Sequence, residues 1–330
     1  MKEIEAGIKT GNFKQVYLLY GEERYLVRHY EKSISNAAVA GDEADMNIDV
    51  FEGKSVSVQK AIDAAMTTPY LANYRVIILR DTSLFEVGKK GESETMSAFL
   101  KHIPESTIII FVETKIDKRN ALYKNVSKQG LAHEFTYIKE TDLREWANRH
   151  FKNYNSEIDA QDIYYLIRRV GCDMSALASE IQKLALYKGA GNEITRADID
   201  NVCKKSLELS IFELVGAAAN KNAGLALDIF NNLLLMKESP IMVIVMVARQ
   251  LRIVLQCKIL KEKGLSPQEI STQTGLRSFI VSEALTQSVS FSAESLKGAI
   301  SKCLEADLNI KTGKMTDTLA VEMLILKICL

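Results

Sequence analysis

The chain has few prolines, a single tryptophan and no excess of either charge. Four prolines among 330 residues leave long helices with few interruptions. Lys and Arg number 42, and Asp and Glu also number 42, so the net charge is zero before histidine is counted. This balance argues against a protein whose whole surface binds nucleic acid, although it permits a local basic patch.

Disulfides, metal sites and membrane spans are also not indicated. The five cysteines are odd in number and widely spaced, with no CxxC pair, which predicts small buried side chains in a reducing cytoplasm. The N-terminus has no apolar core of a signal peptide. A membrane span needs about 20 apolar residues, but the longest apolar run, 240–248, is followed by Arg249, Gln250 and Arg252. We expect a cytoplasmic protein without a membrane partner.

The first 140 residues alternate apolar strands with helical segments. Strands are predicted at 16–20, 47–51, 75–80, 107–112 and 132–137. Helical periodicity lies between them, at 22–40, 57–67, 93–102 and 121–129. Strands separated by helices of about 10–15 residues predict βαβ units and a parallel sheet with right-handed connections.

After residue 140 the pattern predicts helices alone. A capping box is expected to start a helix at Ser210, with Glu213 as its acid, and a second one at Ser266, with Glu269. Ser239 before Pro240 predicts another helix start. We expect three domains: an α/β domain at 1–140, a small helical lid domain at 141–208 and a helical collar domain for oligomerisation at 209–330.

The turn after the first strand does not suit a nucleoside triphosphate. The layout is the one that AAA+ ATPases use, and they carry GxxxxGK[ST] at this turn. Residues 21–26 read GEERYL, with one glycine, no lysine, and Glu22 and Glu23 where phosphate would lie. Asp81, after the third strand, imitates a magnesium ligand but is better explained as a strand-end residue. The sequence predicts an AAA+-like fold that has lost its nucleotide.

The sequence also lacks the common catalytic motifs. The four histidines lie outside any HExxH or carboxylate-paired pattern, and neither GxSxG nor a cysteine–histidine signature occurs. We therefore predict no catalytic residues, no metal and no cofactor, and no enzyme activity of the chain by itself.

Short segments along the whole chain carry a family pattern. They include VYLLYGEERYL at 16–26, PYLANYRVII at 69–78 and LASEIQKLALYKG at 177–189. Further segments lie at 194–199, 211–214, 248–252, 307–313 and 320–325. In order and spacing, they resemble the delta subunit of the bacterial DNA polymerase III clamp loader.

That resemblance implies a function in DNA replication. It implies a subunit that binds the sliding clamp and opens it or holds it open, within an ATP-driven heteropentamer, without hydrolysing ATP itself. The implied partners are the sliding clamp (beta), the ATPase subunits (gamma/tau), delta-prime and primer–template DNA. It further implies a location at the nucleoid-associated replisome of a bacterial cytoplasm.

A short loop is the candidate contact with the clamp. Pro69 stops the preceding helix and stiffens the chain, so Tyr70 and Leu71 are predicted to project from a loop. In the resembled family, two adjacent bulky apolar residues at this place enter a hydrophobic pocket of the clamp. Tyr70 departs from the usual aliphatic or phenylalanine choice but keeps aromatic bulk. The alternative is that both side chains pack beneath their own sheet, as apolar residues usually do.

Residues 266–282 offer a competing interpretation as a helix-turn-helix, with Gly275 in the turn. The second helix, near 278–285, would then read DNA bases, which needs Arg, Asn, Gln or Lys on its exposed face. It offers Arg277 at its start and Gln287 beyond its end, while Glu283 would repel phosphate. Packing inside a helical bundle explains the pattern better, and a helix-turn-helix DNA-binding regulator remains the alternative function.

Two lysines near the C-terminus are candidate DNA contacts. Lys311 and Lys314 flank Gly313 in the predicted collar domain. The resemblance implies that template–primer DNA lies inside the spiral of subunits, within reach of some lysines. A solvated helix face explains these lysines equally well, and the neutral chain predicts weak, salt-dependent DNA binding by itself.

Overall fold

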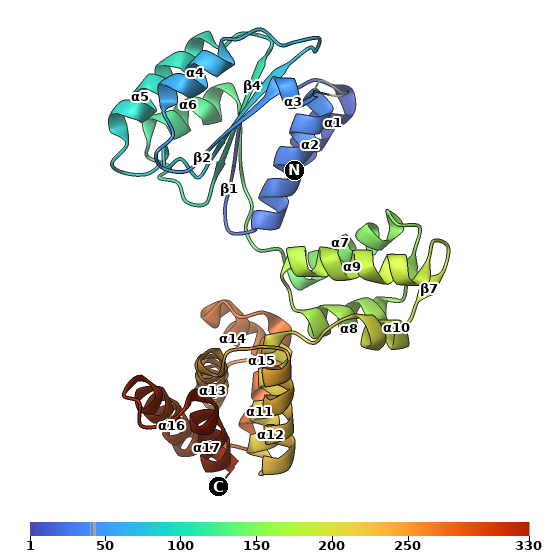
Figure 1. The fold of residues 1–330 in the computed structure, drawn as a ribbon, viewed down its shortest axis with the longest axis vertical. Coiled ribbons are helices and arrows are strands. Elements are labelled where there is room, and N and C mark those ends of the chain that lie inside the picture. Colours follow the sequence, from blue (N-terminus) through green and yellow to red (C-terminus); the bar gives the residue numbers. More distant parts are fainter. Residues whose placement is uncertain (40, 42–43, 330) are drawn as a thin grey trace. The chain divides into compact units, whose positions relative to one another are not determined.

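A five-stranded sheet organises the N-terminal unit of the computed structural model (Figure 1). Its strands are β1 (Val16–Tyr20), β2 (Ile48–Glu52), β3 (Arg75–Arg80), β4 (Thr107–Glu113) and β5 (Leu131–Glu134). They pair in the order β2-β3-β4-β1-β5, and all these pairings are parallel. The predicted parallel α/β domain is confirmed.

The structure describes residues 1–39, 41 and 44–329. The chain divides into two compact units, Met1–Ile138 and Lys139–Leu330. The division falls close to the predicted end of the α/β domain at residue 140. The second predicted boundary, between a lid domain at 141–208 and a collar domain at 209–330, stays a prediction.

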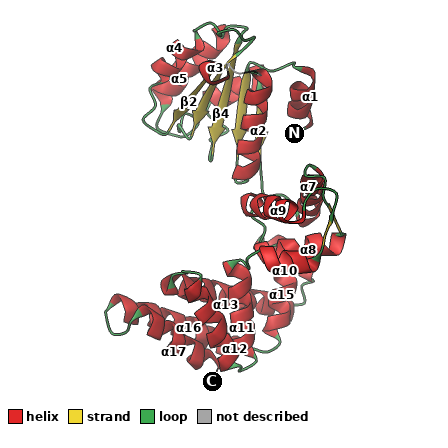
Figure 2. Cartoon of the chain, turned by 45° about the vertical axis from the view of Figure 1, so that its right-hand side comes forward, coloured by secondary structure: helices red, strands yellow, loops and turns green. Residues whose placement is uncertain are grey.

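Helices cover both faces of the sheet (Figures 1 and 2). In the N-terminal unit they are α1 (Lys2–Thr10), α2 (Arg24–Ala38), α3 (Ala44–Asn47), α4 (Val58–Ala65), α5 (Lys90–Phe99), the 3-10 helix η1 (Leu100–His102) and α6 (Ala121–Gln129). One face of β1, β3 and β4 packs against α4, α5 and α6. Every residue of β1 and β4 is buried, because central parallel strands have both faces covered. This frame fixes the strand ends and the loops that follow them.

Helices make up nearly all of the second unit, and Figure 2 shows them in red. They are α7 (Glu140–Lys152), α8 (Ala160–Val170), α9 (Met174–Lys188), α10 (Arg196–Val202), α11 (Leu207–Ala219), α12 (Ala223–Leu235), α13 (Pro240–Glu262), α14 (Pro267–Thr274), α15 (Ser278–Ser288), α16 (Ala293–Lys311) and α17 (Asp317–Cys329). Residues of α11 to α17 share one apolar core.

Two details of this unit differ from the sequence prediction. Short strands β6 (Glu157–Ile158) and β7 (Glu193–Ile194) form a parallel pair, so the region is not purely helical. The predicted helix start at Ser210 is wrong, because the Ser206 hydroxyl caps α11 by accepting from the Leu209 N–H at 3.2 Å. Ser210 lies inside the helix and donates to the Ser206 carbonyl. The predicted capping box at Ser266 is present.

The helix α13 is the one described segment long and apolar enough, by length and composition, to cross a membrane. Core helices of water-soluble proteins pass the same test, so this is weak support for a span. Residues such as Val247, Leu251 and Val254 lie buried in the apolar core of the unit. Among the five cysteines, all present as free thiols, Cys172 is half-buried and the other four are buried.

Candidate functional site

The loop between α4 and β3 exposes the two apolar side chains that the sequence singled out. The Tyr70 residue is 55% exposed and Leu71 is 76% exposed, whereas the β3 residues that soon follow are buried. The alternative, in which both side chains pack beneath the sheet, is therefore wrong for this structure. Pro69 is half-buried and follows the last turn of α4, where it cannot continue the helix.

A buried asparagine holds the backbone of this loop. Asn47, at the end of α3, has no exposed surface. Its side-chain oxygen accepts from the Tyr70 N–H at 2.7 Å, and its side-chain amide donates to the Tyr70 carbonyl at 2.8 Å. Both polar groups of one residue's backbone are thus satisfied by one side chain. Sequence alone does not reveal this role of Asn47, because 23 residues separate it from Tyr70.

The loop has two further restraints. Leu71 has φ +50°, a left-handed conformation that is costly for a branched side chain unless the surroundings hold it. The Tyr74 ring packs edge-on against Phe13, with centroids 5.6 Å apart. Held at Tyr70 and at Tyr74, the loop presents Tyr70 and Leu71 to solvent in a defined conformation.

Other exposed apolar residues come from the segments that meet at the loop. Met66 caps the end of α4 and is 57% exposed, and Met46, just before Asn47, is 65% exposed. Methionine is flexible and polarisable, and it is common at surfaces that bind partners. With Tyr70 and Leu71, these residues form what we call the loop surface.

The turn after β1 is closed by backbone hydrogen bonds. Gly21 has φ +127°, and a Cβ there would lie 2.3 Å from the Phe135 carbonyl oxygen, so glycine is required. The Gly21 N–H donates to the Glu113 carbonyl, and the Glu23 N–H donates to the Phe135 carbonyl at 3.0 Å. In a phosphate-binding loop such N–H groups are free to point at the phosphates.

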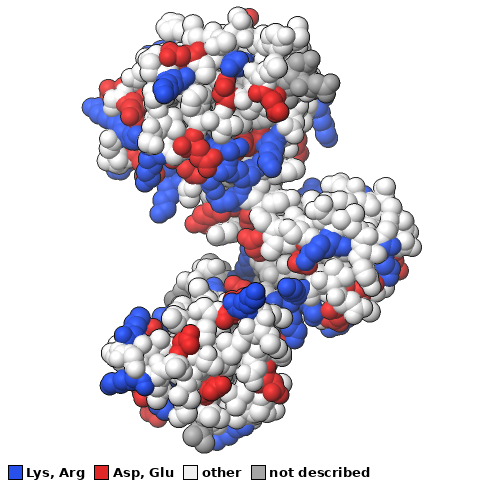
Figure 3. All heavy atoms as spheres, viewed as in Figure 1, with Lys and Arg blue, Asp and Glu red and all other residues white. Residues whose placement is uncertain are grey.

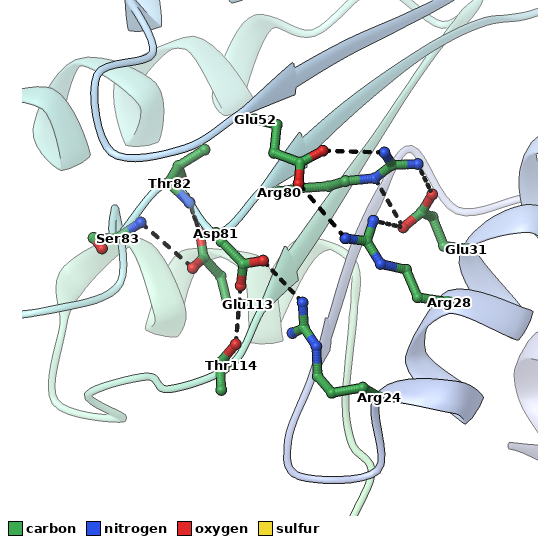
Figure 4. A network of polar contacts seen from close by, with 10 residues as sticks. All are labelled: Arg24, Arg28, Glu31, Glu52, Arg80, Asp81, Thr82, Ser83, Glu113 and Thr114. Atoms are coloured by element: carbon green, nitrogen blue, oxygen red, sulfur yellow. Dashed lines mark hydrogen bonds and ion pairs between the residues drawn. The ribbon is translucent and has the colours of Figure 1, made fainter. Parts of the chain in front are cut away.

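Ion pairs fill the space beyond the carboxyl ends of the strands (Figure 4). Arg24, at the start of α2, pairs with Asp81 at 2.8 Å. Arg80, the last residue of β3, pairs with Glu31 at 2.5 Å and with Glu52 at 3.3 Å. Asp81 thus serves as the partner of an arginine, as a strand-end residue. Arg28, in α2, also pairs with Glu31, at 3.1 Å. We call these residues, together with Glu113, the strand-end network.

A buried carboxyl group completes the strand-end network. Glu113 is 1% exposed and accepts from the Thr82 hydroxyl at 2.6 Å and from the Thr82 N–H at 3.0 Å. Burial raises the pKa of Glu113 to about 7, although the hydrogen bonds from Thr82 and Ser83 oppose the shift. In the sequence, only its place at the end of an apolar strand points to this group.

The predicted DNA contacts lie on exposed surface. Lys311 pairs with Asp307 at 2.7 Å, one helical turn away, and Lys314 is exposed just after α16. Figure 3 shows Lys and Arg interspersed with Asp and Glu over the visible face rather than gathered into one field. Contact of Lys311 and Lys314 with DNA stays a prediction.

The helix-turn-helix segment packs inside the helical unit. Gly275 ends α14 with φ +71°, and α15 follows. Gln287 is 7% exposed, accepts from the Gln250 side chain at 2.9 Å and donates to the Phe212 carbonyl at 2.7 Å. Glu283 forms an ion pair with Arg168. Gln287, one of the two side chains that could read bases, is therefore already engaged within the protein.

Comparison with known proteins agrees with these observations. Residues 17–136 match the model of the family described as DNA polymerase III, delta subunit, and residues 208–328 match that of its C-terminal domain. Together the two matches span more than half of the chain. The chain belongs to the bacterial DNA polymerase III delta subunit family.

Two relatives are similar to this chain over 80% or more of its length. The DNA polymerase III subunit delta of Bacillus subtilis is 27% identical over 333 residues, covering 99% of this chain and 96% of the relative. A probable delta subunit of Aquifex aeolicus is 21% identical over 273 residues, covering 80% and 76%. The solved structure of the Bacillus subtilis DNA clamp loader delta protein has a TM-score of 0.71, with 99% of each chain covered.

Family membership sets the general role of the chain. A delta subunit belongs to the clamp loader of the replication machinery and is not itself a catalytic polymerase. Membership of this family implies that the chain forms a complex with other clamp-loader subunits. A subunit that acts in bacterial DNA replication is located in the cytoplasm.

Proposed function

We propose that this delta subunit binds the sliding clamp through the loop surface and opens the ring or holds it open. The observation that carries the proposal is the exposure of Tyr70 and Leu71 on a loop whose backbone Asn47 holds. Burying two large apolar side chains in a partner's groove yields about 3–6 kcal/mol before ordering costs. Because the loop is already ordered, those costs are small.

We further propose that this chain takes no part in ATP hydrolysis. The N–H groups of Gly21 and Glu23 are occupied by protein carbonyls, and Asp81 is paired with Arg24. A triphosphate would have to break these interactions and would meet the carboxylates Glu22 and Glu23. In this proposal the ATPase subunits (gamma/tau) supply the energy.

A third proposal concerns the surface of the predicted collar domain that contacts other subunits. Exposed apolar side chains lie on its last two helices, among them Leu304, Leu308, Leu319 and Met323. An exposed apolar surface of this kind is typical of subunit contacts. We propose that it joins the ATPase subunits and delta-prime in the heteropentamer at the replisome, around primer–template DNA.

A pull-down with purified sliding clamp tests the first proposal. The immobilised wild-type chain is expected to retain the clamp, and the Tyr70→Ala/Leu71→Ala chain to lose it. Val87→Ala is a matched control, because Val87 is 85% exposed in the same unit but lies outside the loop. Equal retention by the wild-type and double-variant chains would reject the loop as the contact. A calorimetric titration with MgATP tests the second proposal, and stoichiometric uptake would reject it.

A further inference from the structure

A cavity among α7, α8 and α10 is lined by arginine and tyrosine. It has a volume of about 510 Å³. Its described lining residues are Arg144, Ala160, Gln161, Tyr164, Tyr165, Arg168 and Arg196. This lining includes three guanidinium groups and two aromatic rings but no carboxylate. The cavity belongs to the second unit, whereas the loop surface and the strand-end network belong to the N-terminal unit, and neither proposal above uses it.

The aromatic rings hold the arginines in place. The Tyr164 ring contacts two guanidinium groups, with Arg144 at 4.7 Å and Arg168 at 5.9 Å from the ring centroid. The Arg196 guanidinium lies 4.0 Å from the centroid of Tyr165. Cation–π contacts of this kind fix the orientation of the donors, so less conformational entropy is lost when a ligand binds.

The cavity keeps a positive charge despite nearby acids. Arg144 pairs with Glu140, and Arg168 pairs with Glu283, neither of which lines the cavity. Within the described part of the chain, Arg196 has no carboxylate at ion-pair distance.

The acid one helical turn after Arg196 is Asp200, and it is already engaged. Asp200 accepts from Arg169 at 2.7 Å and from the Tyr165 hydroxyl at 2.6 Å. Among the described residues, Arg196 is therefore a cation held by a ring and without an acid of its own. An anion that enters the cavity meets in Arg196 a donor that no carboxylate pairs with, beside two further guanidinium groups that are each paired with one acid.

We propose that this cavity binds a single strand of DNA. Guanidinium groups suit phosphate because they donate two parallel hydrogen bonds. Flat guanidinium–tyrosine stacks also offer a surface on which a base can stack. An acidic peptide fits less well, because Ala160 is the only aliphatic residue in the described lining, and a peptide's apolar side chains would find no pocket. The proposal is independent of clamp binding by the loop surface.

Fluorescence anisotropy of a labelled twelve-nucleotide oligo(dT) tests this site, with the full-length chain at low salt. The test variant is Arg144→Gln/Arg196→Gln, which leaves the Arg168–Glu283 ion pair intact. The control variant is Arg149→Gln/Lys152→Gln, which removes the same charge from exposed positions on α7. Both substituted pairs are exposed, so melting temperatures should match that of the wild type.

We expect the test variant to bind at least tenfold more weakly and the control variant to change less than twofold. The dependence of log affinity on log salt should become shallower by about 0.7 for each phosphate that the variant no longer neutralises. No measurable binding by the wild type, or equal losses of affinity in the two variants, would overturn the proposal. It would also fail if a polyglutamate peptide of equal charge bound as tightly and showed the same loss of affinity in the test variant.

Discussion

The loop surface and the strand-end network lie in the same unit, yet they treat their side chains in opposite ways. In the strand-end network, charged groups such as Arg80 and Glu31 find partners inside the protein. In the loop surface, by contrast, the apolar side chains of Tyr70 and Leu71 are largely exposed to solvent. The strand-end network pairs its charges within the chain, whereas the loop surface leaves apolar side chains exposed for the partner that we propose. Substitutions should therefore affect stability in the first region and binding in the second.

The largest expected effect on stability comes from Arg80→Ala. This substitution removes the closest partner of Glu31, whose side chain is 1% exposed. Leaving a buried charge without its partner costs about 3–5 kcal/mol, and the loss here should lie at the lower end of this range, because Arg28 still pairs with Glu31 at 3.1 Å. Urea denaturation measures the free energy of unfolding, and clamp affinity of the folded variant should stay within twofold of the wild type. A stability loss below about 1 kcal/mol would show that the network is solvated and loose.

Glu113→Gln should change how stability depends on pH. The pKa of Glu113 is about 7 in the folded chain and near 4.5 unfolded. Between these values the unfolded chain loses the proton while the folded chain keeps it, so the wild type loses stability as pH rises from 4.5 to 7. The stability of the variant relative to the wild type should rise by about 3 kcal/mol over this window.

Urea denaturation of both proteins at about pH 4.5, 6 and 7.5 checks this prediction. The difference between the two proteins isolates Glu113 from the histidines that titrate in the same range. A difference independent of pH would show that folding does not raise the pKa of Glu113, and it would contradict the prediction.

Asn47→Ala should have a smaller effect on stability, together with a change in the loop. The substitution removes two hydrogen bonds to the Tyr70 backbone, which costs about 1–3 kcal/mol. Hydrogen exchange at the Tyr70 amide should speed up by at least tenfold, because its acceptor is gone. Clamp affinity should fall as well, because the loop must then be ordered on binding. Unchanged exchange at Tyr70 would contradict a positioning role for Asn47.

Local sequence determined much of the fold. Apolar runs and their spacing located the five strands of the sheet, and Pro69 marked the loop on which Tyr70 and Leu71 are exposed. The interactions that complete both regions join residues far apart in the chain. Asn47 reaches Tyr70 across 23 residues, and Arg24 reaches Asp81 across 57. Such pairs depend on the strand order, which the predicted elements alone do not supply.

Competing local signals explain the smaller errors. Ser206 and Ser210 both suit a helix start, but α11 already begins at Leu207, where the Ser206 hydroxyl caps it. The strands β6 and β7 have two residues each, too short for a period-two pattern to be recognised. In both cases the tertiary structure selects among alternatives that the local sequence leaves nearly equal.

Surface plasmon resonance with immobilised sliding clamp tests the central claim most directly. The Tyr70→Ala/Leu71→Ala chain is expected to bind at least a hundredfold more weakly than the wild type, which corresponds to about 3 kcal/mol. Its melting temperature should be unchanged, because both side chains are exposed in the free chain. Wild-type affinity in the double variant would contradict the account, because the exposed loop would then have no part in holding the clamp.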